Sequence, residues 1–195
     1  MKSLNQITNP KQYPMLAKPF AERYLVPPVY AQPKLDGVRL FWRNDEAYSR
    51  TGKKIEGVPE IIAELKSKFA GFPLDGELYS HEHNFQEIVG HVRRKAKTGN
   101  DHLRIQYHVY DHPVSGVPFT ERWKRLTAAL AKAKGVKYVV AVTTVPADPE
   151  NHNPFAADGY EGTMLRNGTA EYQFNHRSSD LLKVKTSQEE EFEIV

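Results

Sequence analysis

The hexapeptide at 34–39, KLDGVR, places an amine and a guanidinium where both can act on one phosphorylated substrate. Lys34 supplies the amine, and Arg39 follows it by five residues. A neutral lysine amine is a nucleophile, and nearby cations favour that form by disfavouring the ammonium. Asp-Gly turns and exposed lysines are common, so the hexapeptide alone is weak evidence. It predicts a lysine that attacks phosphorus beside an arginine that binds phosphate.

Four further segments follow the hexapeptide in order: LDGEL at 74–78, VYD at 109–111, DGYEGTMLR at 158–166 and LLKVK at 181–185. Glu77 and Glu161 each lie in a strand-like segment flanked by Asp and Gly, from which a carboxylate can point into a cleft. Lys183 and Lys185 share a face of a strand, where two ammonium groups repel each other unless an anion lies between them. A triphosphate would be such an anion.

Three other side chains are candidates for contact with a nucleotide or its metal. The apolar alternation over 105–109 marks one strand face and puts Tyr110 on the other, which favours a ligand-facing ring. Gln32 precedes Lys34 by two residues, and its amide could bind an adenine edge or simply face solvent. Asp36 follows Lys34 by two, so on a continuing strand it would share the lysine's face and orient the amine or a metal-bound water. Its alternative role is that of a turn residue.

The elements that must position these residues are mostly strands. We expect strands at 29–34, 38–43, 74–79, 105–111, 136–143, 162–166 and 181–185, the first two paired across the Asp36-Gly37 turn. Helices are expected at 58–70, at 84–94 and from a capping Thr120 to about residue 134. Several strands are joined by turns too short for parallel crossovers. The pattern predicts an α+β domain with largely antiparallel sheets flanked by helices.

The ordered set of segments resembles the nucleotidyltransferase domain of the ATP-dependent DNA ligases, from about Pro14 to the end of the chain. The resemblance implies three reactions: ATP adenylylates Lys34, the AMP passes to the 5′-phosphate of nicked double-stranded DNA, and the adjacent 3′-hydroxyl seals the nick. The chain is similar to the compact phage, viral and bacterial enzymes of this family.

The same resemblance implies roles for the charged and aromatic candidates. Glu77 would hold the ribose and Tyr110 would stack on the adenine. Mg²⁺ would be assisted by Glu161, with Asp36 as the second candidate, since hard carboxylate oxygens suit this ion. The nucleotide phosphates would be neutralised by Mg²⁺ and by three cations, Arg39, Lys183 and Lys185.

Basic residues outside the nucleotide site are candidates for DNA contact. Arg50, in SRTGK at 49–53, resembles the family's arginine that meets the 5′-phosphate end of the nick. Arg93 and Arg94, in a basic run at 91–97, are expected to contact the duplex backbone without reading sequence. The net charge of +3 is too small to indicate a nucleic-acid partner by itself.

The end of the chain predicts a domain boundary. We expect a nucleotidyltransferase domain at 1–188 and, at 189–195, the start of an oligonucleotide-binding (OB) fold domain, because residues 190–195 alternate charged and apolar side chains. Ligases of this family carry their last motif in that second domain, and the motif is absent from this sequence. Full ligation is therefore expected to need an OB-fold domain in cis.

Composition sets the remaining expectations. A chain of 195 residues with 39% hydrophobic and 26% charged residues suits one soluble globular domain. Without cysteine it has neither disulfides nor thiolate metal sites, and no apolar run reaches the ~20 residues of a membrane span. A cytoplasmic monomer is expected. The eight histidines, His81 and His83 included, do not form a convincing metal site.

Other functions fit parts of the pattern. An RNA ligase and a GTP-using capping-type guanylyltransferase share the lysine chemistry, although VR after the glycine and LDGEL are more similar to the DNA enzymes. A non-catalytic nucleic-acid or protein-interaction module that keeps the fold is a further alternative. An NAD-dependent ligase is disfavoured, because only about thirty residues precede Lys34 and those enzymes need an additional N-terminal domain.

Overall fold

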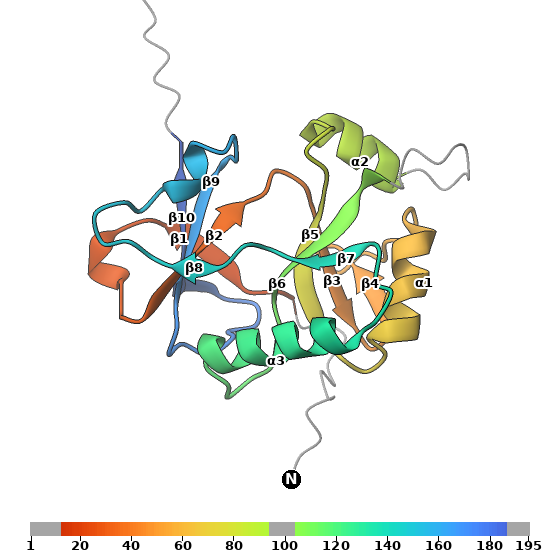
Figure 1. The fold of residues 1–195 in the computed structure, drawn as a ribbon, viewed down its shortest axis with the longest axis horizontal. Coiled ribbons are helices and arrows are strands. Elements are labelled where there is room, and N and C mark those ends of the chain that lie inside the picture. The colour runs from red at the N-terminus through yellow and green to blue at the C-terminus, as the bar shows by residue number, and fades with distance from the viewer. Residues whose placement is uncertain (1–12, 94–103, 187–195) are drawn as a thin grey trace, which may run out of the picture.

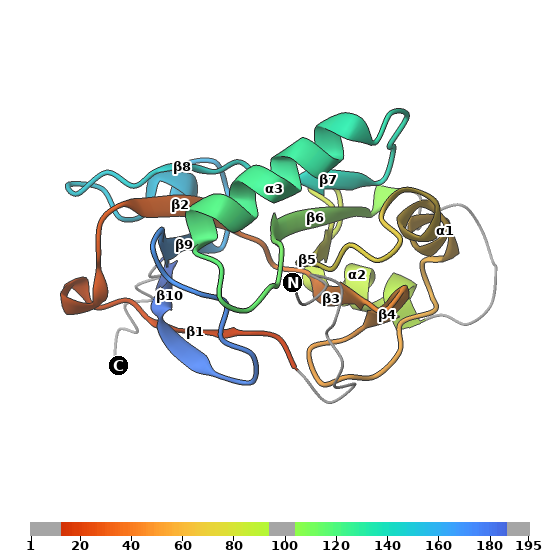
Figure 2. The same cartoon turned by 90° about the horizontal axis from the view of Figure 1, so that it is seen from below.

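The computed structural model describes residues 13–93 and 104–186, which form two five-stranded sheets lying side by side (Figures 1 and 2). The first sheet has the order β1-β10-β9-β2-β8, with β1 at Leu16–Pro19, β2 at Val29–Lys34, β8 at Val145–Pro146, β9 at Gly162–Asn167 and β10 at Arg177–Lys185. The second has the order β4-β3-β5-β6-β7, with β3 at Val38–Arg43, β4 at Glu46–Tyr48, β5 at Leu74–Tyr79, β6 at Gln106–Asp111 and β7 at Val139–Ala141.

The expected fold class is confirmed. Among the described residues every neighbouring strand pair is antiparallel except β1 with β10 and β6 with β7. The helices are α1 at Pro59–Lys68, α2 at Phe85–Arg93 and α3 at Phe119–Lys132, with short 3₁₀ turns at Glu22–Tyr24 and Pro154–Ala156. Helix α3 runs along both sheets (Figure 2).

The expected pairing of 29–34 with 38–43 is wrong. Strand β2 pairs with β8 and β9, whereas β3 pairs with β4 and β5, so residues 35–37 carry the chain from one sheet to the other. A two-residue Asp-Gly hairpin needs positive φ at both residues, and neither Asp36 nor Gly37 has it. Gly37 is required for another reason: a Cβ there would lie 2.3 Å from the carbonyl oxygen of Leu78. The hexapeptide is therefore a crossing between sheets.

Strand β3 shows how the two sheets share the core. Its alternation sends Leu40 and Trp42 into the main hydrophobic cluster, together with residues from α1, β5, β6 and α3. Phe41 points the other way and packs with Met15, Tyr172 and Leu181. The first sheet has its own small cluster, made of Ala31, Phe155, Leu165 and Leu182. The interface between the sheets is thus packed on one side of β3.

Most predicted elements are present, with shifted ends. The strand at 74–79 is confirmed at both ends, and α1 has Pro59 in its first turn as predicted. The predicted cap at Thr120 is wrong: α3 begins at Phe119, and the Thr120 hydroxyl donates to the carbonyl of Gly168 over 3.1 Å. Within the described ranges, no helix combines the length and apolar character that crossing a membrane requires.

Candidate active site

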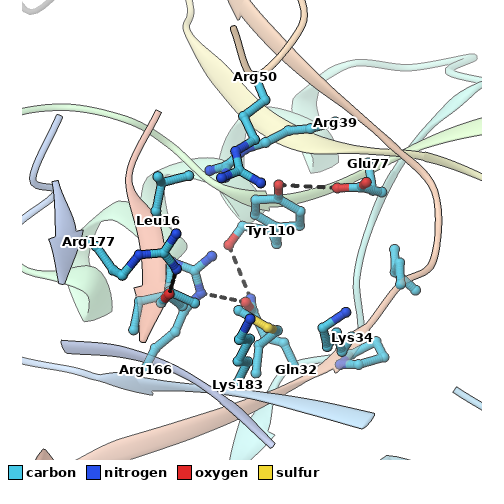
Figure 3. Close-up of a pocket in the computed structure, with 15 residues that line it drawn as sticks. Leu16, Gln32, Lys34, Arg39, Arg50, Glu77, Tyr110, Arg166, Arg177 and Lys183 are labelled. Carbon is cyan, nitrogen blue, oxygen red and sulfur yellow. Dashed lines mark hydrogen bonds between the residues drawn. The ribbon is translucent and has the colours of Figure 1, made fainter. Parts of the chain in front are cut away.

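A cavity of about 260 Å³ opens between the two sheets, as Figure 3 shows. The Tyr110 ring lies near its centre, with Arg39, Arg50 and Glu77 on one side and Lys34 and Lys183 on the other. Seven predicted site residues line it: Gln32, Lys34, Arg39, Arg50, Glu77, Tyr110 and Lys183. The crossing at 35–37 explains why Lys34 and Arg39 line the same cavity. It places Lys34 at the end of β2 in the first sheet and Arg39 near the start of β3 in the second.

Glu161 lies between two lysine ammonium groups. Gly162 pairs with Lys34 in the β2–β9 register, which brings the preceding Glu161 beside the lysine. The Lys34 Nζ donates to Glu161 Oε2, and Lys185 Nζ lies 3.2 Å from Oε1. Partial burial acts to raise the pKa of Glu161, but the bonds and charges of the two lysines outweigh it and hold the pKa below its usual value. Only 18% of the Lys34 side chain is exposed.

Lys183 and Lys185 have different surroundings although both lie on β10. Lys183 lines the cavity, and within the described part of the chain it makes no ion pair. The Lys185 side chain is 59% exposed and pairs with Glu161. The Glu161 carboxylate therefore joins Lys185 to Lys34 and does not pair with Lys183. The free ammonium of Lys183 remains available to an anionic ligand.

Tyr110 lies on the open face of β6, as its alternation predicts, while Tyr107, Val109 and Asp111 are buried. Its hydroxyl donates to Glu77 Oε2 over 3.4 Å, a weak hydrogen bond. The guanidinium of Arg39 lies 5.6 Å from the centre of the ring. A ring held in this way can pack against a planar base.

Glu77 is placed directly opposite Arg39 by the β3–β5 register. Burial raises the pKa of the Glu77 carboxyl to about 8, with Arg39 opposing that rise and Asp75 adding to it. Arg39 itself is fixed by two bonds to Asp75, of 2.9 and 2.6 Å, and Asp75 also accepts from the Tyr172 hydroxyl at 2.7 Å. A largely neutral carboxyl can both donate to and accept from hydroxyl groups of a ligand.

Gln32 is buried, so the solvent-facing alternative is wrong. Its Nε2 donates to the Tyr110 carbonyl at 3.1 Å and to the Thr144 hydroxyl at 3.0 Å, and its Oε1 accepts from Arg166 Nε at 2.6 Å. Both N–H groups are used within the protein. The amide therefore fixes one end of the Tyr110 segment against the first sheet.

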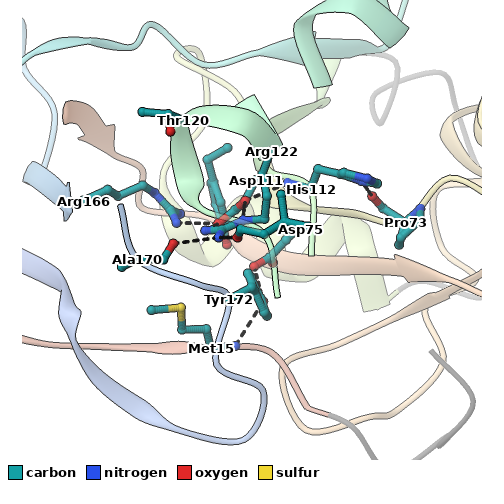
Figure 4. Close-up of polar contacts among 12 residues, drawn as sticks. Met15, Pro73, Asp75, Asp111, His112, Thr120, Arg122, Arg166, Ala170 and Tyr172 are labelled. Carbon is teal, nitrogen blue, oxygen red and sulfur yellow. Dashed lines mark hydrogen bonds and ion pairs between the residues drawn. The ribbon is translucent and has the colours of Figure 1, made fainter. Parts of the chain in front are cut away.

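Arg166 is not among the site residues predicted from the sequence, yet it lines the cavity and joins the two sheets. Its Nη1 donates to Asp111 Oδ2 at 2.7 Å, and Arg122 adds two bonds to the same carboxylate, of 2.8 and 3.0 Å (Figure 4). Asp111 is fully buried; burial acts to raise its pKa, but the two guanidiniums hold that pKa below its usual value. Period two along β9 puts Arg166 on the face of Met164, which also lines the cavity. That alternation was the signal available in the sequence.

A second, larger groove of about 870 Å³ adjoins the cavity and shares Arg39, Arg50 and Glu77 with it. Arg93, at the end of α2, lines this groove, as do Lys53 and Lys54. The predicted contact at Arg94 lies outside the described residues. The groove is therefore basic along the side that continues from the cavity.

The described ranges contain no cluster of three or more His, Asp or Glu side chains that could hold a metal ion. Asp36 is exposed and does not line the cavity, because β2 ends at Lys34 and the expected shared strand face is absent. A Mg²⁺ ion often takes one protein carboxylate with substrate phosphates as further ligands. Glu161, at the edge of the cavity, fits that mode of binding.

Residues 14–185 match the family model described as ATP dependent DNA ligase domain. The chain belongs to this family. Relatives include the DNA ligase of Haemophilus influenzae, 30% identical over 83% of this chain and 59% of that protein. The DNA ligase of African swine fever virus (isolate Tick/Malawi/Lil 20-1/1983) is 29% identical over 95% of this chain and 48% of that protein. The chain thus spans roughly half the length of these relatives.

Solved ligase structures share the fold. A Lig E DNA ligase superposes with a TM-score of 0.76 at 24% identity, covering 89% of this chain and 68% of that one. Chlorella virus DNA ligase-adenylate gives a TM-score of 0.76 at 21% identity, covering 90% and 67%. The resemblance to the ligase nucleotidyltransferase domain is thereby confirmed. None of these relatives is an RNA ligase or a capping enzyme.

Proposed function

We propose that this chain is the adenylyltransferase domain of an ATP-dependent DNA ligase and transfers AMP from ATP to Lys34. One observation carries the proposal: the Lys34 amine stands in the wall of a cavity that also holds a carboxyl, an aromatic ring and cationic groups from both sheets, Arg39 and Lys183 among them. Family membership supports the use of ATP. Lys183 also lines the cavity, but among the described residues only Lys34 of these two lysines is paired with a carboxylate.

The proposed reaction is a substitution at the α-phosphorus of ATP. An ammonium that donates to Glu161 has no free lone pair, so Lys34 must first release a proton to water. The lone pair of Nζ then forms a nitrogen–phosphorus bond, and the bond from the α-phosphorus to the bridging oxygen breaks. Pyrophosphate leaves with that electron pair. The product is lysyl-AMP, in which the phosphate carries one negative charge.

The remaining cavity residues bind the nucleotide in this proposal. Tyr110 packs on the adenine, and the carboxyl of Glu77 binds the ribose hydroxyls. Gln32 lies near the edge of the base and holds the Tyr110 segment in place. The phosphates are neutralised by Arg39 and Lys183 inside the cavity and by Lys185 at its edge. Positive groups from both sheets converge on the phosphates, which stabilises the charge that develops on the leaving group.

Mg²⁺ would be held by Glu161 together with phosphate oxygens, and Asp36 would contribute through water. When bound, the ion supplies positive charge that neutralises the phosphates. Lys34 and Lys185 hold the Glu161 carboxylate ionised, which is the form that binds a cation.

Nicked double-stranded DNA is the proposed second substrate. The adjoining groove supplies Arg50 and Arg93, with Arg94 beyond the described part, to contact phosphates of the duplex. AMP would pass from Lys34 to the 5′-phosphate, and the 3′-hydroxyl would then seal the nick. Full activity is proposed to need an OB-fold domain in cis; its predicted start at 189–195 lies outside the described residues. The protein is proposed to act as a monomer in the cytoplasm, where the lack of cysteine fits a reducing compartment.

The test is incubation with α-labelled ATP and Mg²⁺, followed by denaturation and measurement of label and intact mass. The parent is expected to gain one AMP that added pyrophosphate removes, and Lys34→Ala to gain none. Lys132→Ala, on the exposed side of α3, is the matched control and is expected to label like the parent. Labelling of Lys34→Ala to the parent's level would refute the assignment of the nucleophile.

A further inference from the structure

A hydrogen bond between His81 and Tyr160 joins the two sheets outside the cavity. His81 follows β5 of the second sheet, and Tyr160 precedes β9 of the first. The Tyr160 hydroxyl lies 3.1 Å from His81 Nε2, and the Tyr79 hydroxyl lies 3.1 Å from Nδ1 of the same ring. Both ring nitrogens are therefore engaged, one by each sheet. His81 does not line the cavity.

The Tyr160 ring is also held by packing from both sides. The ring packs against the main cluster of the second sheet and against the small cluster of the first. Among the described residues, Tyr160 is the one partly buried side chain that contacts both clusters. Its ring centre lies 6.0 Å from that of Phe155 and 6.4 Å from that of Tyr79. The position of Tyr160 thus depends on how the two sheets are placed relative to each other.

Tyr160 is the residue directly before Glu161, whose other neighbour is equally constrained. Gly162 has φ +151°, and a Cβ there would lie 2.0 Å from the carbonyl oxygen of Val184. The carbonyl of Glu161 accepts from the Thr186 N–H at 3.2 Å. Glu161 therefore stands between two fixed residues, and the hydroxyl bond to His81 adds a polar contact to the ring packing that reaches the second sheet.

We propose that His81 is a positioning residue for adenylylation: through Tyr160 it keeps the Glu161 carboxylate within reach of the Lys34 amine. The inference rests on the proposed function of Lys34. The β2–β9 register of the first sheet brings the carboxylate beside the nucleophile, and the bond to His81 ties this placement to the second sheet. The loss of one hydrogen bond should slow lysyl-AMP formation without weakening ATP binding, because neither His81 nor Tyr160 lines the cavity.

Tyr160→Phe tests the bond while keeping the ring. In single-turnover experiments with the whole chain, we expect lysyl-AMP formation at saturating ATP to be about fivefold slower, the net effect of one hydrogen bond. The ATP concentration at half-maximal rate should stay the same. Tyr48→Phe is the matched control, since its hydroxyl bonds to Glu46 on the edge strand β4. Equal rates for the two variants, or a change confined to the half-maximal concentration, would overturn the proposal.

Two substitutions at the exposed His81 separate its two bonds. Gln can place an amide near the position of Nε2 and keep the bond to Tyr160, whereas Asn reaches only the position of Nδ1 and keeps the bond to Tyr79. His81→Gln should therefore form lysyl-AMP faster than His81→Asn. An Asn variant as fast as the Gln variant contradicts the positioning role. A parent that forms no lysyl-AMP contradicts the proposed function instead, so the two failures are distinguishable.

Discussion

Lys34 and Arg39 lie five residues apart in the sequence and belong to different β-sheets. Lys34 is the last residue of β2, and Arg39 is the second of β3. A short extended crossing joins them, and both side chains line one cavity. The proposed nucleophile and the proposed phosphate-binding cation thus face the same space from separate sheets.

Glu161→Gln should slow lysyl-AMP formation about a hundredfold. The amide keeps the size of the side chain but removes the charge that lies between Lys34 and Lys185. Rates measured in single turnovers with labelled ATP would show the loss. A rate within a factor of three of the parent would mean that the carboxylate's charge does not contribute.

Asp111→Asn should destabilise the fold by about 3 kcal/mol, because it leaves two buried guanidiniums with a neutral partner. Chemical denaturation would measure the change. Glu121→Gln is the control: it removes a partly exposed pair with Arg125 on α3 and should cost less than about 1 kcal/mol. Similar losses for the two variants would refute a special contribution from the buried charges.

Glu77 should make stability fall as pH rises from about 5 to 8. Its pKa is raised from 4.5 to about 8 in the folded state, so between these values the folded protein keeps a proton that the unfolded chain has lost. The contribution is complete below the lower value and is lost as pH passes the upper one, with a slope of at most about 1.4 kcal/mol per pH unit. Glu77→Gln should lack this slope. Parallel curves for the two proteins would show that the carboxyl ionises normally.

Gly37→Ala should destabilise the protein by about 2 kcal/mol, because the added Cβ would lie 2.3 Å from the Leu78 carbonyl oxygen and 2.9 Å from Glu77 Cγ. Gly90→Ala on α2 is the control, since nothing lies within 4 Å of its Cβ and alanine favours a helix. We expect that variant to be as stable as the parent or more stable. The order of the two midpoints of thermal unfolding checks the prediction.

Arg50→Ala should weaken binding to nicked duplex DNA about tenfold and reduce the slope of log K against log salt by about 0.9, the value for one phosphate contact. Arg50 lies where the cavity and the basic groove meet. Lys132→Ala removes a positive charge from α3 and should change neither quantity. An unchanged salt slope for Arg50→Ala would exclude a direct phosphate contact.

Motifs with glycine and charged residues could be predicted from the sequence because each is local. Lys34, Glu77 and Tyr110 were selected from short segments, and the structure brings their side chains to one cavity. The alternation of side chains along a strand was also sufficient to predict that the Tyr110 ring lies on the open face of β6. Their roles toward ATP remain predictions.

Long-range partners could not be predicted in the same way. Arg166 and Asp111 are 55 residues apart in the sequence. Their contact depends on how the two sheets are placed relative to each other, which a local sequence pattern does not predict. An Asp-Gly pair fits both a hairpin turn and a crossing between sheets, so the composition of residues 36–37 does not separate the two. Strands β1 and β8, of 4 and 2 residues, are too short to show a period.

The buried bond between Arg166 and Asp111 has a consequence for motion. Arg166 comes from the first sheet and Asp111 from the second, and Tyr172 and Asp75 repeat such a link beside them (Figure 4). Hinging the sheets apart would break this buried ion pair and separate Arg166 from its carboxylate. The two walls of the cavity should therefore move together as one rigid body, and the width of the cavity should change little between states of the protein.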